Sequence, residues 1–379
     1  MKILALADLH MGAGAAYADD RLHDQMKVLE QVAQICFDQD IELVLIAGDV
    51  FHRPRPTPAT LLAFRRFTDV LATMQVPTIA CLGNSGHDQE GIDRPCALDL
   101  FESPLFRVSR RPELITAFPG VSVATLPSVP VSRLVAQSES AERGPVFDQA
   151  AEALLAIAGE LRRDAGADKP CVLVGHWSVS GASLPNGLPV DSLNEPILDI
   201  ASLERLNYDA IVMGHLHLYQ RLGSDASVFY CGSPMTVDFG EAGHDHGCVI
   251  LDTDTGTHEF RVLKDRAFVT VGVSIDDTHG WSLDSDEDLA DAVVRVRYRA
   301  TEEQHRRVDT AALKKAILDA GAHKVFQISA EIVKADRARV QGVDENLDPA
   351  AALALWCEAN EVDGEGLADL LARYSVTAP

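Results

Sequence analysis

The chain is poor in basic residues and has neither paired cysteines nor long apolar runs. Its 33 Lys and Arg stand against 57 Asp and Glu, which gives a formal net charge of −24. That balance excludes a protein that binds nucleic acid through a generally cationic surface, but it leaves room for a local basic patch or for bound metal ions. The seven cysteines are scattered and form no C-x-x-C pair. We therefore expect buried, reduced thiols rather than a disulfide framework or a zinc ribbon.

No apolar run approaches the roughly 20 residues that a membrane span requires. The N-terminal segment MKILALADLH is apolar only as far as Asp8, so it predicts a first strand rather than a signal peptide. We expect a cytoplasmic protein without a membrane anchor. With 379 residues, of which 47% are hydrophobic, the chain is long enough for two or three folded units.

Short apolar runs alternate with helical patterns through the first two-thirds of the chain. This alternation predicts a layered α/β domain, and the uniformly apolar runs indicate strands that are covered on both faces. The predicted strands are 2–8, 42–49, 76–84, 121–127, 171–176 and 209–215, and the predicted helices are 22–37, 60–71 and 147–161.

The pattern changes after residue 230. Residues 247–263 predict two strands joined by an Asp-Thr-Gly turn. A second unit begins near residue 268, with further strands and a helix near 309–320, in an order that suits a small β-α-β domain. Residues 341–379 contain eight acidic residues and one basic residue, with apolar-periodic pieces at 349–357 and 366–374.

Chemically reactive side chains gather where five of these strands end. The carboxyl ends of strands in an open α/β sheet form the ligand crevice, so clusters that are distant in sequence can converge. Imidazole, carboxylate and amide oxygen suit manganese, iron or zinc, and two ions about 3.5–4 Å apart would use this many ligands to catalyse phosphoryl displacement. The clusters are DLH at 8–10, GDVFH at 48–52, GNSGHD at 83–88, GH at 175–176 and GHLH at 214–217.

This series of motifs resembles that of the calcineurin-like metallophosphoesterases. Two longer segments, GDVFHRPRPTP at 48–58 and YCGSPMTVDFGE at 230–241, are similar to the SbcD-type DNA-repair nuclease subunits. The resemblance implies an α/β fold of four layers, a β-sandwich flanked by helices, with a small α/β capping domain and a helical tail. We accordingly expect a metallophosphoesterase domain at 1–265, a capping domain that steers DNA at 266–338 and an acidic docking tail at 339–379.

The resemblance also implies a pair of divalent metal ions, expected to be Mn²⁺, and a metal-activated water that hydrolyses phosphodiester bonds. Asp49 would bridge the two ions, and His52 would help to place the scissile phosphate. The implied ligands are Asp8, His10, Asp49 and His217 for one ion, and Asp49, Asn84, His176 and His215 for the other.

The sequence departs from the family at the histidine that protonates the leaving group. The family has His directly after Asn, whereas Ser85 and Gly86 here separate Asn84 from His87. Because glycine tolerates positive φ, the inserted pair either bulges and returns His87 to the site or leaves the imidazole several ångströms away. General acid catalysis contributes roughly 10²–10⁴-fold, so the outcome decides the rate. The next residue, Asp88, either orients His87 or is an ordinary loop carboxylate.

Other polar groups have two interpretations. His244 and His246 suggest a further metal site or, as we expect, a flexible polar loop. Residues 53–112 contain eight basic and six acidic residues. They either contact phosphates beside the motifs or form a solvated face with ion pairs.

Together, these features predict a two-metal DNA exonuclease or endonuclease that belongs to an SbcCD-type repair or recombination complex. The resemblance implies a nucleoid-associated homodimer, built by helices near 59–73 and 95–103, that binds DNA ends and single strands. It also implies a coiled-coil ATPase partner of the SbcC type, docked by the tail. Two alternatives remain open: a metallophosphoesterase of small nucleotides or phosphoproteins, and a catalytically weakened scaffold that binds DNA ends.

Overall fold

The computed structural model describes residues 1–379 except 19, 92, 136–142, 225–226, 276–279, 285–286, 334–347, 360–365 and 367–379. Contacts divide the chain into two compact units. None of the helices formed by the described residues combines the length and the apolar composition of a membrane span. The first unit comprises Met1–Val273, Leu283–Arg297 and Asp309–Ser329, and the second comprises Ser274–Ser282, Tyr298–Val308 and Ala330–Pro379.

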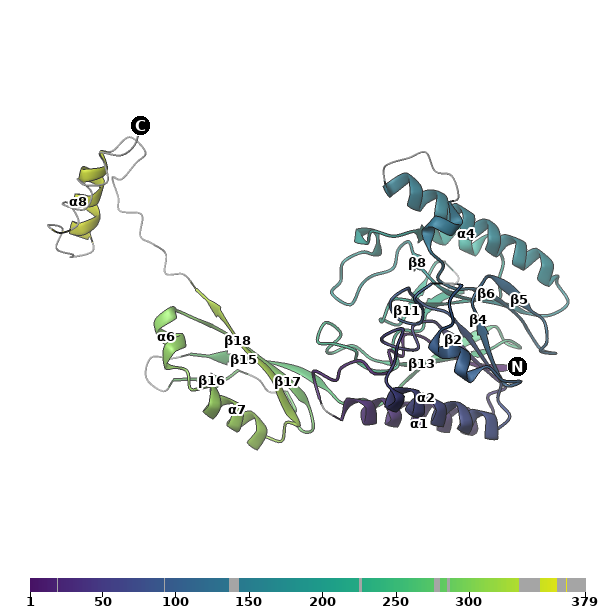
Figure 1. The fold of residues 1–379 in the computed structure, drawn as a ribbon, viewed down its shortest axis with the longest axis horizontal. Helices are drawn as coiled ribbons and strands as arrows, with labels where there is room; N and C mark the ends of the chain where they lie inside the picture. Colours follow the sequence, from purple (N-terminus) through teal and green to yellow (C-terminus); the bar gives the residue numbers. More distant parts are fainter. Residues whose placement is uncertain are drawn as a thin grey trace. The chain divides into compact units, whose positions relative to one another are not determined.

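Two six-stranded sheets form the centre of the first unit (Figure 1). Each has a parallel centre, with antiparallel strands at one edge of the first sheet and at both edges of the second, so the carboxyl ends of the central strands share one side. The first sheet has the order β14 (Thr257–Val262), β13 (Gly247–Asp252), β1 (Lys2–Leu6), β2 (Leu43–Ala47), β3 (Thr78–Cys81), β4 (Phe106–Ser109). The second has the order β11 (Gln220–Leu222), β12 (Val228–Tyr230), β10 (Ala210–Gly214), β7 (Cys171–His176), β6 (Ser122–Leu126), β5 (Glu113–Ile115).

The two sheets pack face to face. Leu45 of the first sheet and Val174 and Val212 of the second belong to one fully buried cluster between them. Strands in this position are buried on both faces, which is why their sequences read as continuous apolar runs instead of alternating patterns.

Helices cover the outer faces of the sandwich, as Figure 1 shows with α1 and α2 on one side and α4 on the other. Val28 of α1 and Phe64 of α2 pack on the first sheet, and Leu154 of α4 packs on the second. Helix α2 begins where Thr57 caps the amide of Thr60 ahead of a proline at the first helical position. The helices are α1 (Arg21–Asp38), α2 (Pro58–Thr73), η1 (Ala97–Phe101), α3 (Val131–Leu134), α4 (Arg143–Ala165), η2 (Val190–Ser192) and α5 (Ile200–Glu204).

A four-stranded sheet follows, and a two-stranded sheet lies in the loop region after β7. Within the first unit, Phe268 and Val293 of the four-stranded sheet pack with Phe239, and Arg266 binds Asp24 of α1 through two hydrogen bonds of 2.7 and 2.9 Å. The four-stranded sheet has the order β16 (Ser282–Leu283), β15 (Phe268–Ser274), β17 (Val293–Ala300), β18 (Lys324–Ile332). The two-stranded sheet consists of β8 (Ser178–Val179) and β9 (Ile197–Leu198). The remaining helices are α6 (Glu302–Arg307), α7 (Thr310–Asp319) and α8 (Pro349–Ala359).

The predicted layered α/β fold is confirmed, with two mixed sheets between helical layers. The hairpin at 247–263 forms as expected, as β13 and β14. The proposed domain boundaries remain predictions. In the tail, α8 corresponds to the first apolar-periodic piece, and the piece at 366–374 lies outside the described residues except for Gly366.

Candidate metal centre

The predicted ligands lie where the central strands of the sandwich end, and several of them have an unusual backbone. Asp8, His10, Asp49 and His215 have φ angles of 51°, 41°, 51° and 96°. Only eight of the described non-glycine residues have positive φ, so half of them are predicted ligands. Positive φ is sterically unfavourable for such residues, and strain of this kind clusters at functional sites.

Glycines allow the strand ends to approach each other closely. A Cβ atom on Gly83 would lie 2.1 Å from Oδ1 of Asp49, and one on Gly214 would lie 1.9 Å from the carbonyl oxygen of Ala47. Both distances are far inside van der Waals contact. Gly83 and Gly214 are therefore required for the loops from the two sheets to meet.

Hydrogen bonds then fix the predicted ligands from the first sheet against those from the second. Both carboxylate oxygens of Asp8 accept the backbone N–H of His215 at 3.0 Å. Asp49 accepts the backbone N–H of Asn84 at 2.6 Å, and its other oxygen lies 3.4 Å from Nε2 of His176. Residues as far apart in the sequence as Asp8 and His217 are thus brought into one site.

Among the described residues, three sets of donor atoms have the spacing of metal ligands, and two of them consist of predicted ligands: Asp8 with His10 and His217, and Asp8 with Asp49 and His176. In the first set, Nε2 of His10 and Nε2 of His217 face each other at 3.0 Å. The Asn84 side-chain amide lies 2.9 Å from Nδ1 of His215. All seven predicted ligands therefore lie in this one site.

The charges of the site favour an added cation. Burial alone would lower the pKa of His176, but Asp49 and Asp8 raise it to about 10. Burial also opposes protonation of His217, whose pKa the hydrogen bond to Glu241 nevertheless raises to about 9. Buried carboxylates that hold protons on neighbouring imidazoles this strongly would hold divalent cations in their place.

The residues present fit a pair of divalent cations. His176 donates from Nδ1 to the carbonyl oxygen of Ala47 at 2.7 Å, so the buried Nε2 is the nitrogen at which a cation would replace a proton. That Nε2 has no hydrogen-bond partner among the described residues, although it faces Asp49. A buried ring nitrogen without a hydrogen-bond partner is costly, and a bound metal ion would satisfy it.

His52 and His87 lie beside the predicted ligands, despite the inserted Ser85 and Gly86. The insertion forms a tight turn in which Gly86 has a φ of 105° and the amide of His87 donates to the carbonyl oxygen of Asn84 at 3.1 Å. Nε2 of His87 lies 3.9 Å from Oδ2 of Asp49. Nitrogen atoms of His10, His52 and His87 fall within 4.8 Å of one another.

Asp88 lies beneath this turn and is fully buried. Its two carboxylate oxygens accept the backbone amides of Phe51 and Gly83, each at 3.0 Å. Burial, followed by the charge of Asp49, raises the pKa of Asp88 to about 6. Through these two hydrogen bonds, the Asp88 carboxylate links the loop of the GDVFH motif at 48–52 to the loop of the GNSGHD motif at 83–88. His87 is instead oriented by the carbonyl oxygen of His52, which accepts its Nδ1–H at 2.8 Å.

Sequence reasoning missed three residues that hold ligands in place. Glu195 accepts Nε2–H of His215 at 2.6 Å, and Glu241 accepts Nδ1–H of His217. Gln25 of α1 contacts the loop that carries His10. Glu241 belongs to the segment at 230–241 that was singled out as a motif, whereas nothing in the sequence marks Glu195 or Gln25.

Within the loop at 244–246, the two histidines differ in burial, and His246 is not a solvent-exposed residue. Its side chain is buried, and its Nδ1 lies 2.9 Å from Oγ of Ser233. His244 is exposed, and its Nε2 lies 3.0 Å from the carbonyl oxygen of Pro185. The local sequence GEAGHDHG is polar, and only tertiary contacts bury its second histidine.

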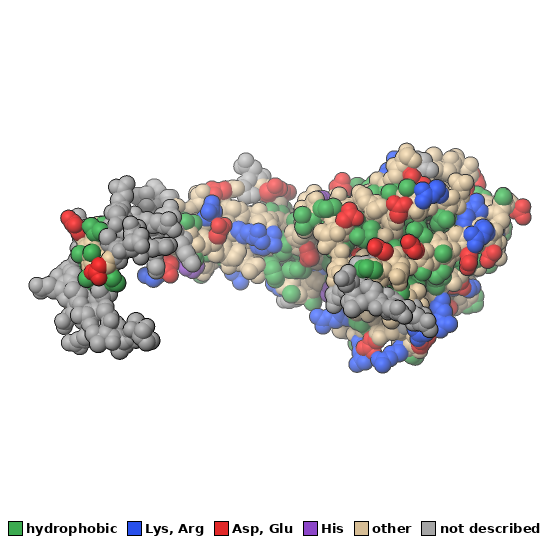
Figure 2. Space-filling view, turned by 90° about the horizontal axis from the view of Figure 1, so that it is seen from above, with side chains coloured by type: hydrophobic (Ala, Val, Ile, Leu, Met, Phe, Trp, Pro, Cys, Tyr) green, Lys and Arg blue, Asp and Glu red, His purple; other side chains and the backbone are tan. Residues whose placement is uncertain are grey.

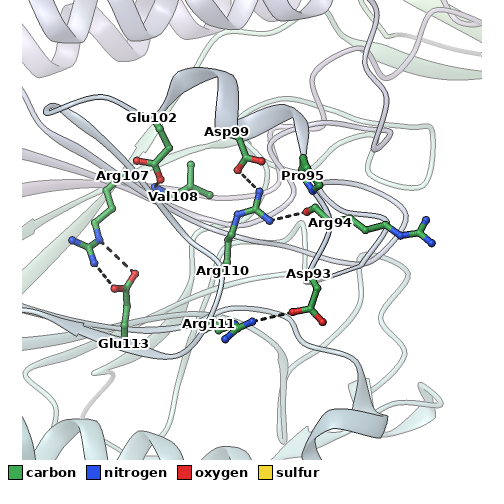
Figure 3. Close-up of a pocket in the computed structure, with 10 residues that line it drawn as sticks. All are labelled: Asp93, Arg94, Pro95, Asp99, Glu102, Arg107, Val108, Arg110, Arg111 and Glu113. Carbon is green, nitrogen blue, oxygen red and sulfur yellow. Dashed lines mark hydrogen bonds and ion pairs between the residues drawn. The ribbon is translucent and has the colours of Figure 1, made fainter.

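The cluster of arginines near the motifs forms ion pairs. A cavity of about 780 Å³ lies among Asp93, Asp99 and their neighbours, and Figure 3 shows Arg107, Arg110 and Arg111 directed at carboxylates. Arg111 pairs with Asp93 at 2.9 Å, and Arg110 pairs with Asp99. On the face shown in Figure 2, acidic and basic side chains are interspersed. The interpretation as a solvated face with ion pairs therefore fits these arginines.

The profile of the family described as calcineurin-like phosphoesterases matches residues 1–219, more than half of the chain, and the chain belongs to this family. The matched region contains all seven predicted ligands together with His52 and His87. Proteins of this family bind a pair of metal ions, which explains why so many metal-ligand residues lie at this site.

Among characterised relatives, the chain is 25% identical over 257 residues to the SbcD component of the SbcCD nuclease from Escherichia coli (strain K12), a match that covers 64% of this chain and 62% of the relative. It is 27% identical over 333 residues to DNA double-strand break repair protein Mre11 of Haloferax volcanii, which covers 85% of this chain and 66% of that protein. The matches thus span slightly less than two-thirds of each relative.

Solved structures with a similar fold include a dimetal phosphatase from Danio rerio, with a TM-score of 0.39 and 12% identity over 66% of this chain and 91% of that one. A purple acid phosphatase from yellow lupin has a TM-score of 0.41 and 13% identity over 70% of this chain and 52% of that one.

Proposed function

We propose that this protein is a two-metal DNA nuclease that hydrolyses phosphodiester bonds as the catalytic component of an SbcCD-type repair complex. The observation that carries the proposal is the extent of the similarity to Mre11 of H. volcanii, which covers 85% of the chain. A relationship confined to the phosphoesterase fold would end near residue 219, where the family match ends. The longer match supports a DNA substrate instead of a small phosphoester.

The two metal ions, for which we propose Mn²⁺, would supply an activated water and neutralise charge on the phosphoryl oxygens. Asp8, Asp49 and five further predicted ligands would hold them. Because Nδ1–H of His87 is already bound to the carbonyl oxygen of His52, its Nε2 is the atom that faces the site and would pass a proton to the leaving oxygen. The His52 ring, beside those of His10 and His87, would contact the scissile phosphate.

The proposal extends to partners through the same relatives. We propose that α2 and η1 form a homodimer contact, because Leu62 and Leu100 on these helices are exposed by 63% and 62%. Exposed large apolar side chains on neighbouring elements are typical of protein contacts. We also propose that the C-terminal segment with α8 docks an SbcC-type ATPase.

The test is cleavage of an end-labelled linear duplex with Mn²⁺, with and without the ATPase partner. We expect cleavage by the wild type, loss of cleavage and of metal binding in Asp49→Ala, and a loss of roughly 10²–10⁴-fold with metals retained in His87→Ala. Glu259→Ala, a change on the exposed face of β14, is the control and should cleave normally.

Two outcomes would replace the proposal. Hydrolysis of bis-p-nitrophenyl phosphate without any DNA cleavage would assign a small-substrate phosphodiesterase. Binding of DNA ends that persists in Asp49→Ala, together with an inactive wild type that has both metals bound, would assign a scaffold.

A further inference from the structure

We propose that Glu195 and Glu241 are positioning residues that hold His215 and His217 in opposite tautomers, so that His215 presents Nδ1 to the metal centre and His217 presents Nε2. This inference rests on the proposed ligand set. It concerns two carboxylates that lie outside the sequence motifs at the strand ends, and it explains how two histidines only two residues apart can serve the same centre.

The His215 and His217 rings bind their carboxylates through different nitrogen atoms. His215 donates from Nε2 to Glu195 at 2.6 Å, and its Nδ1 lies 2.9 Å from the Asn84 side-chain amide. His217 donates from Nδ1 to Glu241, and its Nε2 lies 3.0 Å from Nε2 of His10. A neutral imidazole donates from one nitrogen and accepts at the other, so each bond to a carboxylate selects which nitrogen has the free lone pair.

The backbone explains why opposite tautomers are needed. His215 is the first residue after β10 and has a φ of 96°, while its backbone amide is bound to Asp8. With this backbone, the His215 ring places Nδ1, the nitrogen nearer to the backbone, at the site. His217 follows after Leu216, which is buried in the core, and its ring reaches the site with the distal nitrogen.

Glu241 is fixed in position, so it cannot move with the His217 ring if that ring rotates. Its side chain is only 5% exposed, and its second oxygen accepts the backbone amide of Val237 at 2.8 Å. Ser233, four residues before Val237, donates its backbone N–H to the carbonyl oxygen of His217 at 3.0 Å, and its hydroxyl contacts the buried His246. The segment from Ser233 to His246 therefore binds both the ring and the backbone of His217.

Glu195 is held less rigidly. It lies in the loop before β9, its side chain is 32% exposed, and its carboxylate accepts the hydroxyl of Ser178 in β8. Burial alone would raise the pKa of Glu195, but the hydrogen bond from His215 lowers it, so the carboxylate stays charged at neutral pH. A charged acceptor strengthens the bond to the imidazole and raises the basicity of the free nitrogen.

The test compares Glu195→Gln and Glu241→Gln in the full chain, with Glu259→Gln as a matched control on the exposed β14. Glutamine keeps the size of the side chain and one carbonyl acceptor, but it removes the charge and adds a competing N–H donor. Titration calorimetry with Mn²⁺ and the visible spectrum of the Co²⁺-loaded protein report on the centre without any substrate. We expect one of two binding sites to weaken by roughly 10–100-fold in each variant, with a changed Co²⁺ spectrum.

Wild-type affinity and an unchanged spectrum in both variants would overturn the inference. A wild type that binds fewer than two ions would instead overturn the proposed ligand set. If either variant fails to fold, ¹⁵N-histidine NMR of the Zn²⁺-loaded wild type decides. The inference requires one ring bound through Nδ1, whose signal disappears in His215→Asn, and at least one bound through Nε2; only Nε2-bound rings would refute it.

Discussion

The side-chain amide of Gln25 donates to the carbonyl oxygen of His10 at 3.1 Å. Oε1 of the same Gln25 side chain accepts the backbone N–H of Gly12 at 2.8 Å. Gln25 is 2% exposed and belongs to α1, so one helix fixes the loop that carries the first histidine of the centre. His10 has a φ of 41°, and the two bonds stabilise this backbone against relaxation.

Replacing Gln25 with alanine should therefore weaken metal binding by about tenfold and reduce the free energy of unfolding by about 1–3 kcal/mol. Titration with Mn²⁺ and urea unfolding measure the two effects. Gln34→Ala, on the exposed side of the same helix, is the matched control and should change neither. Equal effects in both variants would mean that Gln25 acts only through helix stability.

Gly86→Ala should slow DNA cleavage by about tenfold or more while leaving the number of bound metal ions unchanged. The φ of Gly86 is 105°, which alanine disfavours, although no atom lies within 4 Å of the added Cβ. The turn should relax and move His87, which follows it directly. Gly166→Ala is the control, because Gly166 also has positive φ and open space but follows α4, away from the metal centre. Normal cleavage in Gly86→Ala would contradict a role for the turn.

Removal of metal ions should lower the melting temperature by roughly 5 °C or more. The proposed ligands come from both sheets, so bound ions join the two halves of the sandwich. An ion at 100 times its dissociation constant contributes about 2.7 kcal/mol, and about 2–4 °C accompanies each kcal/mol in domains of a few hundred residues. Thermal unfolding with EDTA and then with added Mn²⁺ measures the shift. Asp49→Ala should show no such shift, and a shift of equal size there would place the stabilising ions elsewhere.

Asp99→Asn should destabilise the protein by about 1 kcal/mol at pH 7, and the difference should diminish as the pH falls below the ordinary aspartate pKa of about 4. Burial alone would raise the pKa of Asp99, but the hydrogen bonds from Arg110 and from the amide of Cys96 hold it below its ordinary value. A lowered carboxyl pKa contributes stability above the unfolded-state value, and this contribution is lost as the pH falls through the folded-state value. Urea unfolding at several pH values measures it. A difference independent of pH would assign the effect to packing.

The main strands and the clusters of polar residues at their ends could be predicted from the sequence because both leave local patterns. All five residues of β2 are buried and apolar, and its polar motif begins directly after it. Short strands leave no such pattern, as in the two-residue β8. Glu195 sits in a loop without a motif, and Gln25 resembles any polar residue of an amphipathic helix. Their roles depend on contacts with His215 and His10, which are far away in the sequence.

The left-handed backbone at Asp8, His10, Asp49 and His215 has a consequence for the history of the chain. Each of these residues holds a conformation that glycine or asparagine adopts more easily, so selection for folding alone would replace them. Their presence is explained by the proposed metal binding, which would outweigh this cost in stability. In a descendant that no longer required its metal ions, we expect these four positions to be substituted first, and to be substituted by glycine.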